Sequence, residues 1–134
     1  MRLRILLVED HADCALSTVM MLRLWGHEVE VATDGPAALQ AAQALQPDVV
    51  LLDIGLPGMD GWAVAKRMRA QPKANRLLIV ALTGYGRKAD IGLSVESGIA
   101  VHLTKPVDPD RLRLLLDNWQ ATLARKAQVL GCLA

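Results

Sequence analysis

Residues 49–53 read Val-Val-Leu-Leu-Asp, a short apolar run that ends directly in a carboxylate, and this run is the clearest indication of the fold. A run that is apolar nearly from end to end is typical of a parallel strand that helices cover on both faces. Two more such runs extend near residues 3–8, where Arg4 is the exception, and 77–82. A shorter run, residues 28–32, alternates polar and apolar side chains, which indicates an edge strand with one face in water. The sequence therefore predicts a mostly buried parallel sheet.

Helical patterns lie between these runs. The first helix is expected over about residues 13–25 and stops at Gly26, which readily adopts the left-handed conformation at a helix end. The second opens near Pro36, and the third follows Gly61. A weaker helix is expected over residues 87–97. Strands that alternate with helices along the chain predict βαβ units and the α/β fold class.

The last helix opens near Pro109 and carries one apolar stripe at helical spacing. The stripe consists of Leu112, Leu115, Leu116, Trp119, Leu123 and Leu130. A helix that reaches Leu130 would be about 33 Å long, which exceeds what a small sheet covers. We therefore expect residues 1–122 to form the domain, and residues 123–134 to extend this helix, where they fray or pack on a partner.

Composition narrows the class of protein. The 134 residues suffice for one domain, and a content of 52% hydrophobic and 22% charged residues is that of a packed chain. The net charge of +1 comes without a basic stripe, so we expect no nucleic-acid partner. No run is long enough to span a bilayer or to form a signal peptide, which predicts a cytoplasmic domain without membrane contact. Cys14 and Cys132 have no ligand spacing, and Cys14 is expected to be a small buried hydrophobe.

The apolar runs end in polar residues that suit phosphate and metal chemistry. These endings are Glu9 and Asp10, then Asp53, then Thr83 and, after a run at residues 101–104, Lys105 and Pro106. If the runs are parallel strands of one sheet, all the endings lie along its carboxyl edge. Ligands of open α/β sheets bind at that edge. Residues scattered along the sequence thus form one candidate site.

The carboxylates of this set call for a cation. Two unit charges about 4 Å apart repel by roughly 4 kcal/mol at an effective dielectric of 20. Glu9, Asp10 and Asp53 therefore need a metal ion or a shared proton, and a few carboxylates with room for water and phosphate suit Mg²⁺. Lys105 adds a positive charge for a phosphoryl oxygen, and Thr83 adds a hydroxyl donor. The set indicates a phosphoryl-transfer site in which Asp53 is the nucleophile.

Each of these residues also has an ordinary structural interpretation. Asp10 alone could cap the first helix, and Asp53 alone could cap a turn. Thr83 alone is a common strand end, and the pair Lys105-Pro106 is a common turn. The functional interpretation depends on all four endings falling on successive strands with fitting chemistry.

Together these motifs resemble the receiver domain of two-component response regulators, over roughly residues 3–120. The motifs are Val8-Glu9-Asp10, Asp53-Ile54-Gly55-Leu56-Pro57-Gly58-Met59-Asp60-Gly61, Ala81-Leu82-Thr83-Gly84 and Thr104-Lys105-Pro106. The resemblance implies a flavodoxin-like (βα)5 three-layer sandwich with a five-stranded parallel sheet in the order 2-1-3-4-5. The residues around Asp53 and Thr83 resemble those of receivers attached to hybrid sensor histidine kinases, which modestly favours this origin over a stand-alone regulator.

The resemblance also implies a chemistry. Asp53 would accept a phosphoryl group from a histidine kinase or a histidine phosphotransfer domain, so the domain would catalyse only its own phosphorylation and dephosphorylation. The implied cofactor is Mg²⁺, for which Mn²⁺ can substitute. Its implied ligands are Glu9, Asp10, Asp53 and the backbone carbonyl of Gly55. Thr83 and Lys105 would bind the phosphoryl oxygens, and the Lys105–Pro106 bond is expected to be cis.

Phosphorylation is expected to switch one face of the domain, formed by the helix at residues 87–97, the last strand and the last helix. In the family an aromatic residue three positions before the lysine turns inward during this step. Here that position is His102, and the chain contains no phenylalanine. His102 is either an ordinary, partly buried strand histidine or a group whose protonation, with an ordinary pKa near 6.5, couples pH to this face.

Other functions fit the residues less well. An aspartyl phosphatase usually needs a second aspartate two residues after the first, where this chain has Gly55. A flavodoxin-like electron carrier needs a phosphate loop after the first strand, where Glu9 and Asp10 would repel a phosphate. A receiver-like interaction module that is never phosphorylated stays open. The output partner is not specified by the sequence, and a weak homodimer is one option.

Overall fold

The centre of the molecule is a parallel sheet with the strand order β2-β1-β3-β4-β5, which confirms the predicted topology. The computed structural model describes all residues except 1, 57, 59, 73, 85–90 and 134. Two residues of the motif at residues 53–61, Pro57 and Met59, therefore lie outside the described residues. The strands are β1 (Arg4–Val8), β2 (Glu28–Ala32), β3 (Val49–Asp53), β4 (Leu78–Thr83) and β5 (Val101–Thr104).

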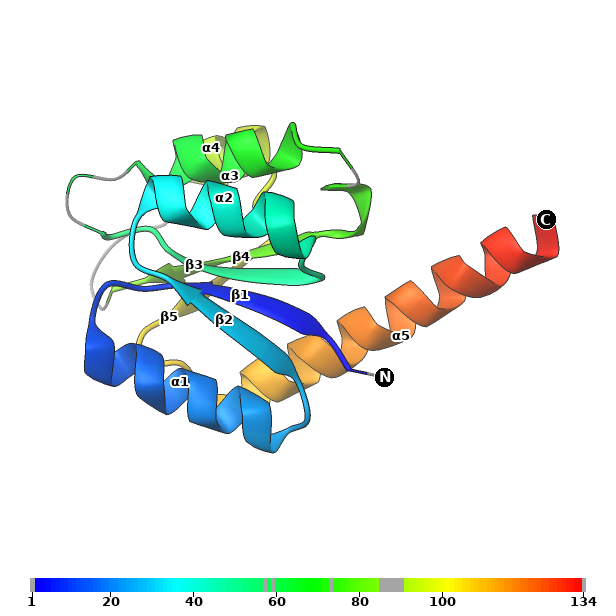
Figure 1. Ribbon diagram of the computed structural model, residues 1–134, viewed down its shortest axis with the longest axis horizontal. Helices are drawn as coiled ribbons and strands as arrows, with labels where there is room; N and C mark the ends of the chain where they lie inside the picture. The colour runs from blue at the N-terminus through cyan, green and yellow to red at the C-terminus, as the bar shows by residue number, and fades with distance from the viewer. Residues whose placement is uncertain (1, 57, 59, 73, 85–90, 134) are drawn as a thin grey trace.

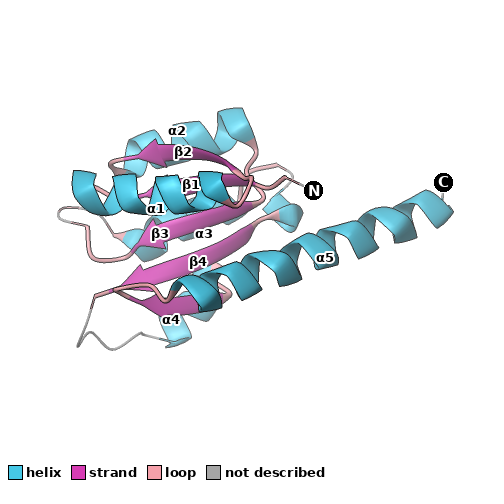
Figure 2. Ribbon diagram, turned by 90° about the horizontal axis from the view of Figure 1, so that it is seen from below, coloured by secondary structure: helices cyan, strands magenta, loops and turns pink. Residues whose placement is uncertain are grey.

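Helices cover both faces of this sheet. They are α1 (Ala12–Leu24), α2 (Gly35–Leu45), α3 (Gly61–Arg69), α4 (Ile91–Ser97) and α5 (Pro109–Leu133), and a short 3₁₀ helix, η1 (Ala74–Arg76), precedes β4. Figures 1 and 2 show α1 and α5 on one face and α2, α3 and α4 on the other. The weak helix expected at 87–97 is α4, and its expected first turn, residues 87–90, falls outside the described part of the chain.

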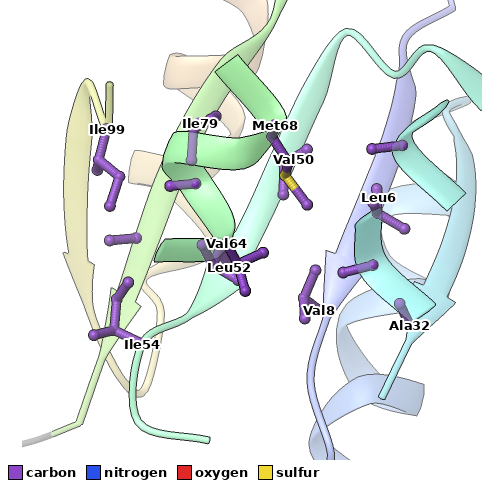
Figure 3. Packing of buried hydrophobic residues seen from close by; sticks show 14 of the residues in the cluster. Leu6, Val8, Ala32, Val50, Leu52, Ile54, Val64, Met68, Ile79 and Ile99 are labelled. Atoms are coloured by element: carbon purple, nitrogen blue, oxygen red, sulfur yellow. The ribbon is translucent and has the colours of Figure 1, made fainter. Parts of the chain in front are cut away.

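Strand alternation divides the core into two layers. On the side of α2, α3 and α4, the sheet contributes Leu6, Val8, Val50, Leu52, Ile79 and Ala81, several of which are visible in Figure 3. On the side of α1 and α5, it contributes Ile5, Leu7, Val49, Leu51, Val80 and Leu82. Every residue of β3 and β4 is buried, as their unbroken apolar sequences predict. The edge strand β2 is more exposed, as its alternating sequence predicts.

The helix ends follow from local side-chain chemistry. The Nδ1 atom of His11 accepts a hydrogen bond from the Cys14 amide and caps α1, so Asp10 is not the cap. Gly26, with a φ of +95°, follows the helix as predicted. Cys14 is exposed, and the expectation that it is buried was wrong. The reason is its position on α1, which buries Ala15, Val19 and Leu22 against the sheet and leaves Cys14 on the outer side.

Helix α5 continues through Leu133 and projects past the sheet (Figures 1 and 2). Its anchored part buries Leu112, Leu116 and Leu123. Trp119 is partly buried, and its Nε1 atom donates a hydrogen bond to the Asp48 carbonyl oxygen at 2.9 Å. Nowhere in the described part of the chain is a helix both long and apolar enough to cross a membrane.

Candidate functional site

The carboxyl edge of the sheet brings the polar strand endings together. Glu9 directly follows β1, Asp53 ends β3, Thr83 ends β4, and Lys105 directly follows β5. These four strands are neighbours in the sheet, so their ends lie side by side. Asp53 pairs with Leu82 in the register, and Thr83 pairs with Thr104. The topology therefore places these side chains in one row, although the sequence separates Glu9 from Lys105 by nearly the whole domain.

Lys105 joins the two buried carboxylates of this row. Its Nζ atom donates a hydrogen bond to Glu9 Oε2 at 2.5 Å and another to Asp53 Oδ2 at 2.7 Å. Its backbone amide donates to the Thr83 carbonyl oxygen at 2.7 Å, and the peptide bond from Lys105 to Pro106 is cis. The Lys105 side chain is 27% exposed, against 4% for Glu9 and 11% for Asp53, so Lys105 is the more accessible partner in both ion pairs.

A third carboxylate completes an acidic cluster. Glu9, Asp10 and Asp53 each offer an oxygen, and these oxygens lie within 4.8 Å of one another. Asp10 is exposed, whereas the other two are buried. The amide of Gly55 donates to Asp53 Oδ1 at 2.8 Å, which places the Gly55 peptide beside the cluster and makes Asp53 the cap of a turn as well. Oxygen donors with one side open to solvent fit a Mg²⁺ ion, which retains several water ligands.

Burial and charge act in opposite directions on the groups of the site. Burial raises the pKa of the Glu9 carboxyl, the hydrogen bond from Lys105 lowers it, and the neighbouring Asp53 raises it, with a net increase. Burial lowers the pKa of the Lys105 ammonium, but its hydrogen bonds to Asp53 and Glu9 outweigh this effect and raise the pKa overall. Lys105 therefore stays protonated at neutral pH, and one ammonium faces three carboxylates.

The remaining predicted residues lie at the β4 and β5 side of the row. Thr83 is buried, at 4% exposure, and ends β4 beside Asp53. His102 pairs with Ala81 in the sheet register, so its side chain lies on the face that α4 covers. Its Nδ1 atom is buried and has no hydrogen-bond partner among the described residues. The structure thus places Thr83 in the row, and His102 on the same face of the sheet, two register positions before it.

Sequence reasoning missed a second, structural cation at the opposite edge of the sheet. Arg69, in the last turn of α3, donates to the Gly98 carbonyl oxygen through Nε at 3.0 Å and Nη2 at 2.9 Å. Its Nη1 atom donates to the carbonyl oxygens of Ala74 and Leu77. These bonds tie α3 to η1 and to the turn before β5. The last turn of α3 also contains Lys66 and Arg67, so the sequence offers no signal that distinguishes Arg69.

Comparisons with known proteins agree with this arrangement. The response regulator receiver domain family matches residues 5–117. The DNA-binding response regulator MtrA of Mycolicibacterium paratuberculosis is 41% identical over 112 residues, which are 84% of this chain and 48% of MtrA. This chain thus spans about half the length of the curated relatives that it matches.

Solved structures show the same architecture. The receiver domain of the sensor histidine kinase PA1611 from Pseudomonas aeruginosa PAO1, with a magnesium ion coordinated in its active site cleft, has a TM-score of 0.78 and 32% identity, covering 89% of this chain and 98% of that chain. The CheY-like receiver domain from Methanospirillum hungatei JF-1 has a TM-score of 0.78 and 26% identity, covering 96% of this chain and 98% of that chain.

Proposed function

We propose a function for this chain as a member of the response regulator receiver domain family of two-component signalling, to which it belongs. In this function, Asp53 accepts a phosphoryl group from a phosphohistidine. The main support for this proposal is the position of Lys105, whose Nζ atom donates a hydrogen bond to Asp53 Oδ2 at 2.7 Å. A carboxylate oxygen of Asp53 forms the new bond to phosphorus. The phosphorus–nitrogen bond of the donor breaks, and its electron pair stays on the imidazole.

The other residues of the site support this step electrostatically. Phosphoryl transfer depends mainly on positioning and on neutralising the oxygens of the transferred group. Lys105 supplies a positive charge next to Asp53, and the Thr83 hydroxyl supplies a donor at the end of the adjacent strand. We assign Glu9, Asp10, Asp53 and the Gly55 carbonyl as ligands for Mg²⁺, or Mn²⁺, which when bound would neutralise phosphoryl charge.

The donor in this proposal is a protein, a histidine kinase or a histidine phosphotransfer domain. An exposed apolar stripe on α1, made of Leu16, Met20 and Leu24 at 60%, 63% and 84% exposure, supports a protein partner. The stripe lies on α1, which begins two residues after Asp10, so a protein docked there reaches the site. We place this exchange in the cytoplasm and assign it to residues 1–122, with residues 123–134 as an extension of α5.

The proposed output is the face formed by α4, β5 and α5. A phosphoryl group on Asp53 adds acceptor oxygens that attract the Thr83 hydroxyl, which alters the β4 end next to this face. His102 lies on this face, and we propose that its protonation couples pH to partner binding. Replacing His102 with tyrosine should then flatten the pH dependence of binding to a cognate partner, and an unchanged pH profile would contradict this role.

Intact-mass analysis tests the phosphorylation. The protein is incubated with acetyl phosphate and Mg²⁺, beside the variants Asp53→Asn and Asp13→Asn. Asp13 is an exposed carboxylate of α1 outside the acidic cluster, so its variant is a matched control. We expect one phosphoryl adduct on the parent and on Asp13→Asn, and none on Asp53→Asn. A folded parent without an adduct would favour the alternative, a receiver-like interaction module that is not phosphorylated.

A further inference from the structure

A second concave site lies at the amino edge of the sheet, opposite the acidic cluster. It is a cavity of about 770 Å³ between the start of β1, the end of α2 and the connection from α3 to β4. Pockets for small molecules commonly have volumes of about 300–1,000 Å³, so this cavity has room for a ligand of nucleotide size. One β-strand separates it from the acidic cluster, a distance of about 16 Å for five residues.

The cavity has an apolar floor and a cationic rim. Pro72, which is exposed, and Ala74, which is half-buried, offer apolar atoms that a ligand can reach and form the floor, whereas Met68 and Leu77 also line the cavity but are buried. The rim carries the guanidinium groups of Arg2, Arg4 and Arg76, against the single carboxylate of Asp48. Such a combination suits a molecule with a flat apolar part and a charged anionic part, because arginine binds phosphate with two parallel hydrogen bonds.

The rim arginines are available to a ligand. Arg76 makes no hydrogen bond or ion pair with any residue that the structure describes. Arg2 and Arg4 share Glu28, at 3.3 Å and 4.0 Å, through exposed pairs that contribute about 0–1 kcal/mol each. Arg4 also donates from Nη1 to the Leu45 carbonyl oxygen at 3.2 Å, in an exposed hydrogen bond. The Asp48 carboxylate already accepts the Arg4 backbone amide at 2.9 Å, so it opposes an anion less than a free carboxylate would.

The side chains between floor and rim offer neutral hydrogen bonds. Gln43 and Gln46 line the cavity at the end of α2, where Gln46 has a φ of +49° and caps the helix. An amide side chain donates and accepts, so it can match the edge of a nucleobase or a sugar hydroxyl. A free phosphate ion would use the rim alone and leave the floor and these amides without a role.

We propose that this amino-edge cavity binds a nucleoside phosphate, with the phosphates on the arginine rim and the base over Pro72 and Ala74. The site is independent of the phosphoryl chemistry at Asp53. A ligand there lies against η1, which Arg69 connects to the turn before β5.

Isothermal titration calorimetry with ADP tests the proposal, in EDTA and about 0.15 M salt, where charges beyond about 8 Å are screened. EDTA removes any cation that could hold ADP at the acidic cluster. We expect saturable binding that Arg76→Gln and Arg4→Gln each weaken about tenfold, equivalent to about 1.4 kcal/mol. Arg111→Gln, an exposed arginine of α5 outside the cavity, and Asp53→Asn should leave the affinity unchanged.

Two further probes test the ligand class. Adenosine lacks the phosphates and pyrophosphate lacks the base, so each should bind at least about tenfold more weakly than ADP. Pyrophosphate that binds as tightly as ADP would overturn the nucleotide assignment. No saturable binding of ADP, or equal binding by the parent and Arg76→Gln, would overturn the site itself. Near-ultraviolet circular dichroism checks that each variant is folded. If Arg4→Gln is not folded, the affinity of Arg76→Gln for ADP decides the outcome.

Discussion

Lys105 at the carboxyl edge and Arg69 at the amino edge are both partly buried cations, but their partners differ in kind. Lys105 bonds to two carboxylates, Glu9 and Asp53, which are themselves charged and which a metal ion or a phosphoryl group can engage instead. Arg69 donates hydrogen bonds to three backbone carbonyl oxygens, which are neutral and have no role in the proposed reaction. The hydrogen bonds of Lys105 can therefore be replaced by those of a bound ion or phosphoryl group, whereas the hydrogen bonds of Arg69 hold the chain in place.

The two edges also differ in their surrounding charge. The helices begin near the carboxyl edge, where Asp34 and Asp60 cap α2 and α3, and the acidic cluster lies there as well. They end near the amino edge, where Arg69 and the arginine rim are found. Helix dipoles favour this distribution, because acids stabilise the starts of helices and bases stabilise their ends. The acidic cluster and the arginine rim therefore lie where the helix dipoles favour their charges.

Removing the Arg69 side chain should give the largest loss of stability. Arg69→Met leaves the carbonyl oxygens of Ala74, Leu77 and Gly98 without their donor, at a cost of about 3 kcal/mol in the free energy of unfolding. Urea denaturation measures the loss, and the phosphoryl adduct on Asp53 should still form. The matched control is Arg67→Met, an exposed arginine of the same helical turn, which should change stability by less than about 0.5 kcal/mol. Equal losses for both variants would contradict the structural role of Arg69.

The close approach of Gly98 to Arg69 gives the next largest effect. Gly98 has a φ of +81°, and a Cβ atom there would lie 2.5 Å from Arg69 Cγ. Gly26 has a φ of +95° with nothing within 4 Å of such a Cβ. Gly26→Ala should therefore cost only the backbone strain, about 1 kcal/mol, while Gly98→Ala should cost about 2–3 kcal/mol because it also displaces Arg69. Thermal denaturation compares the two, and equal losses would show that Arg69 yields freely.

Magnesium should stabilise the carboxyl edge and have no effect through the amino edge. At ten times its dissociation constant, a bound ion adds about 1.4 kcal/mol to the free energy of unfolding. Lys105→Met should enlarge this effect, because the carboxylates then lack their ammonium, and Asp10→Asn should diminish it. Melting temperatures with and without Mg²⁺ give the comparison. A gain that is the same in the parent and in Asp10→Asn would place the ion elsewhere.

The smallest effect is a pH dependence that originates at the amino edge. His27 is buried, its Nδ1 atom accepts the Leu3 amide at 3.2 Å, and burial lowers its pKa, although the charge of Asp117 acts in the opposite direction. The unfolded chain therefore binds a proton that the folded chain resists, and stability falls as the pH drops below about 6.5. His27→Gln should reduce this slope in urea titrations between about pH 7.5 and 5.5.

One outcome contradicts this assignment. If His27→Gln leaves the slope unchanged, the pH dependence does not come from His27.

Local sequence predicted much of the fold and the candidate site. The nearly continuous apolar runs became the buried strands β1, β3 and β4, with only Arg4 exposed at the start of β1, and the alternating run became the edge strand β2. The candidate site could be assembled from sequence because parallel strands put their ends on one edge. Glu9, Asp53, Thr83 and Lys105 therefore had to meet once the strand order was known.

The one prediction that was wrong concerned the orientation of a side chain. Cys14 was expected to be buried, but α1 is turned so that Ala15 and Val19 face the sheet. The role of Arg69 could not be predicted, because its partners are carbonyl oxygens of other segments. The sequence does not distinguish Arg69 from Arg67 in the same turn. Backbone acceptors carry no sequence signature.

The class of fold and the residues that gather at the carboxyl edge follow from the amino-acid sequence, as does the strand order that the family resemblance implies. Hydrophobic periodicity and side-chain chemistry are properties of the chain itself, so they can be recognised before the chain is folded. Folding sets which carboxylates accept from Lys105 and which carbonyl oxygens accept from Arg69, and it brings arginines of β1 and η1 to one cavity at the amino edge. Those facts depend on distances between segments remote in sequence, and packing alone sets such distances.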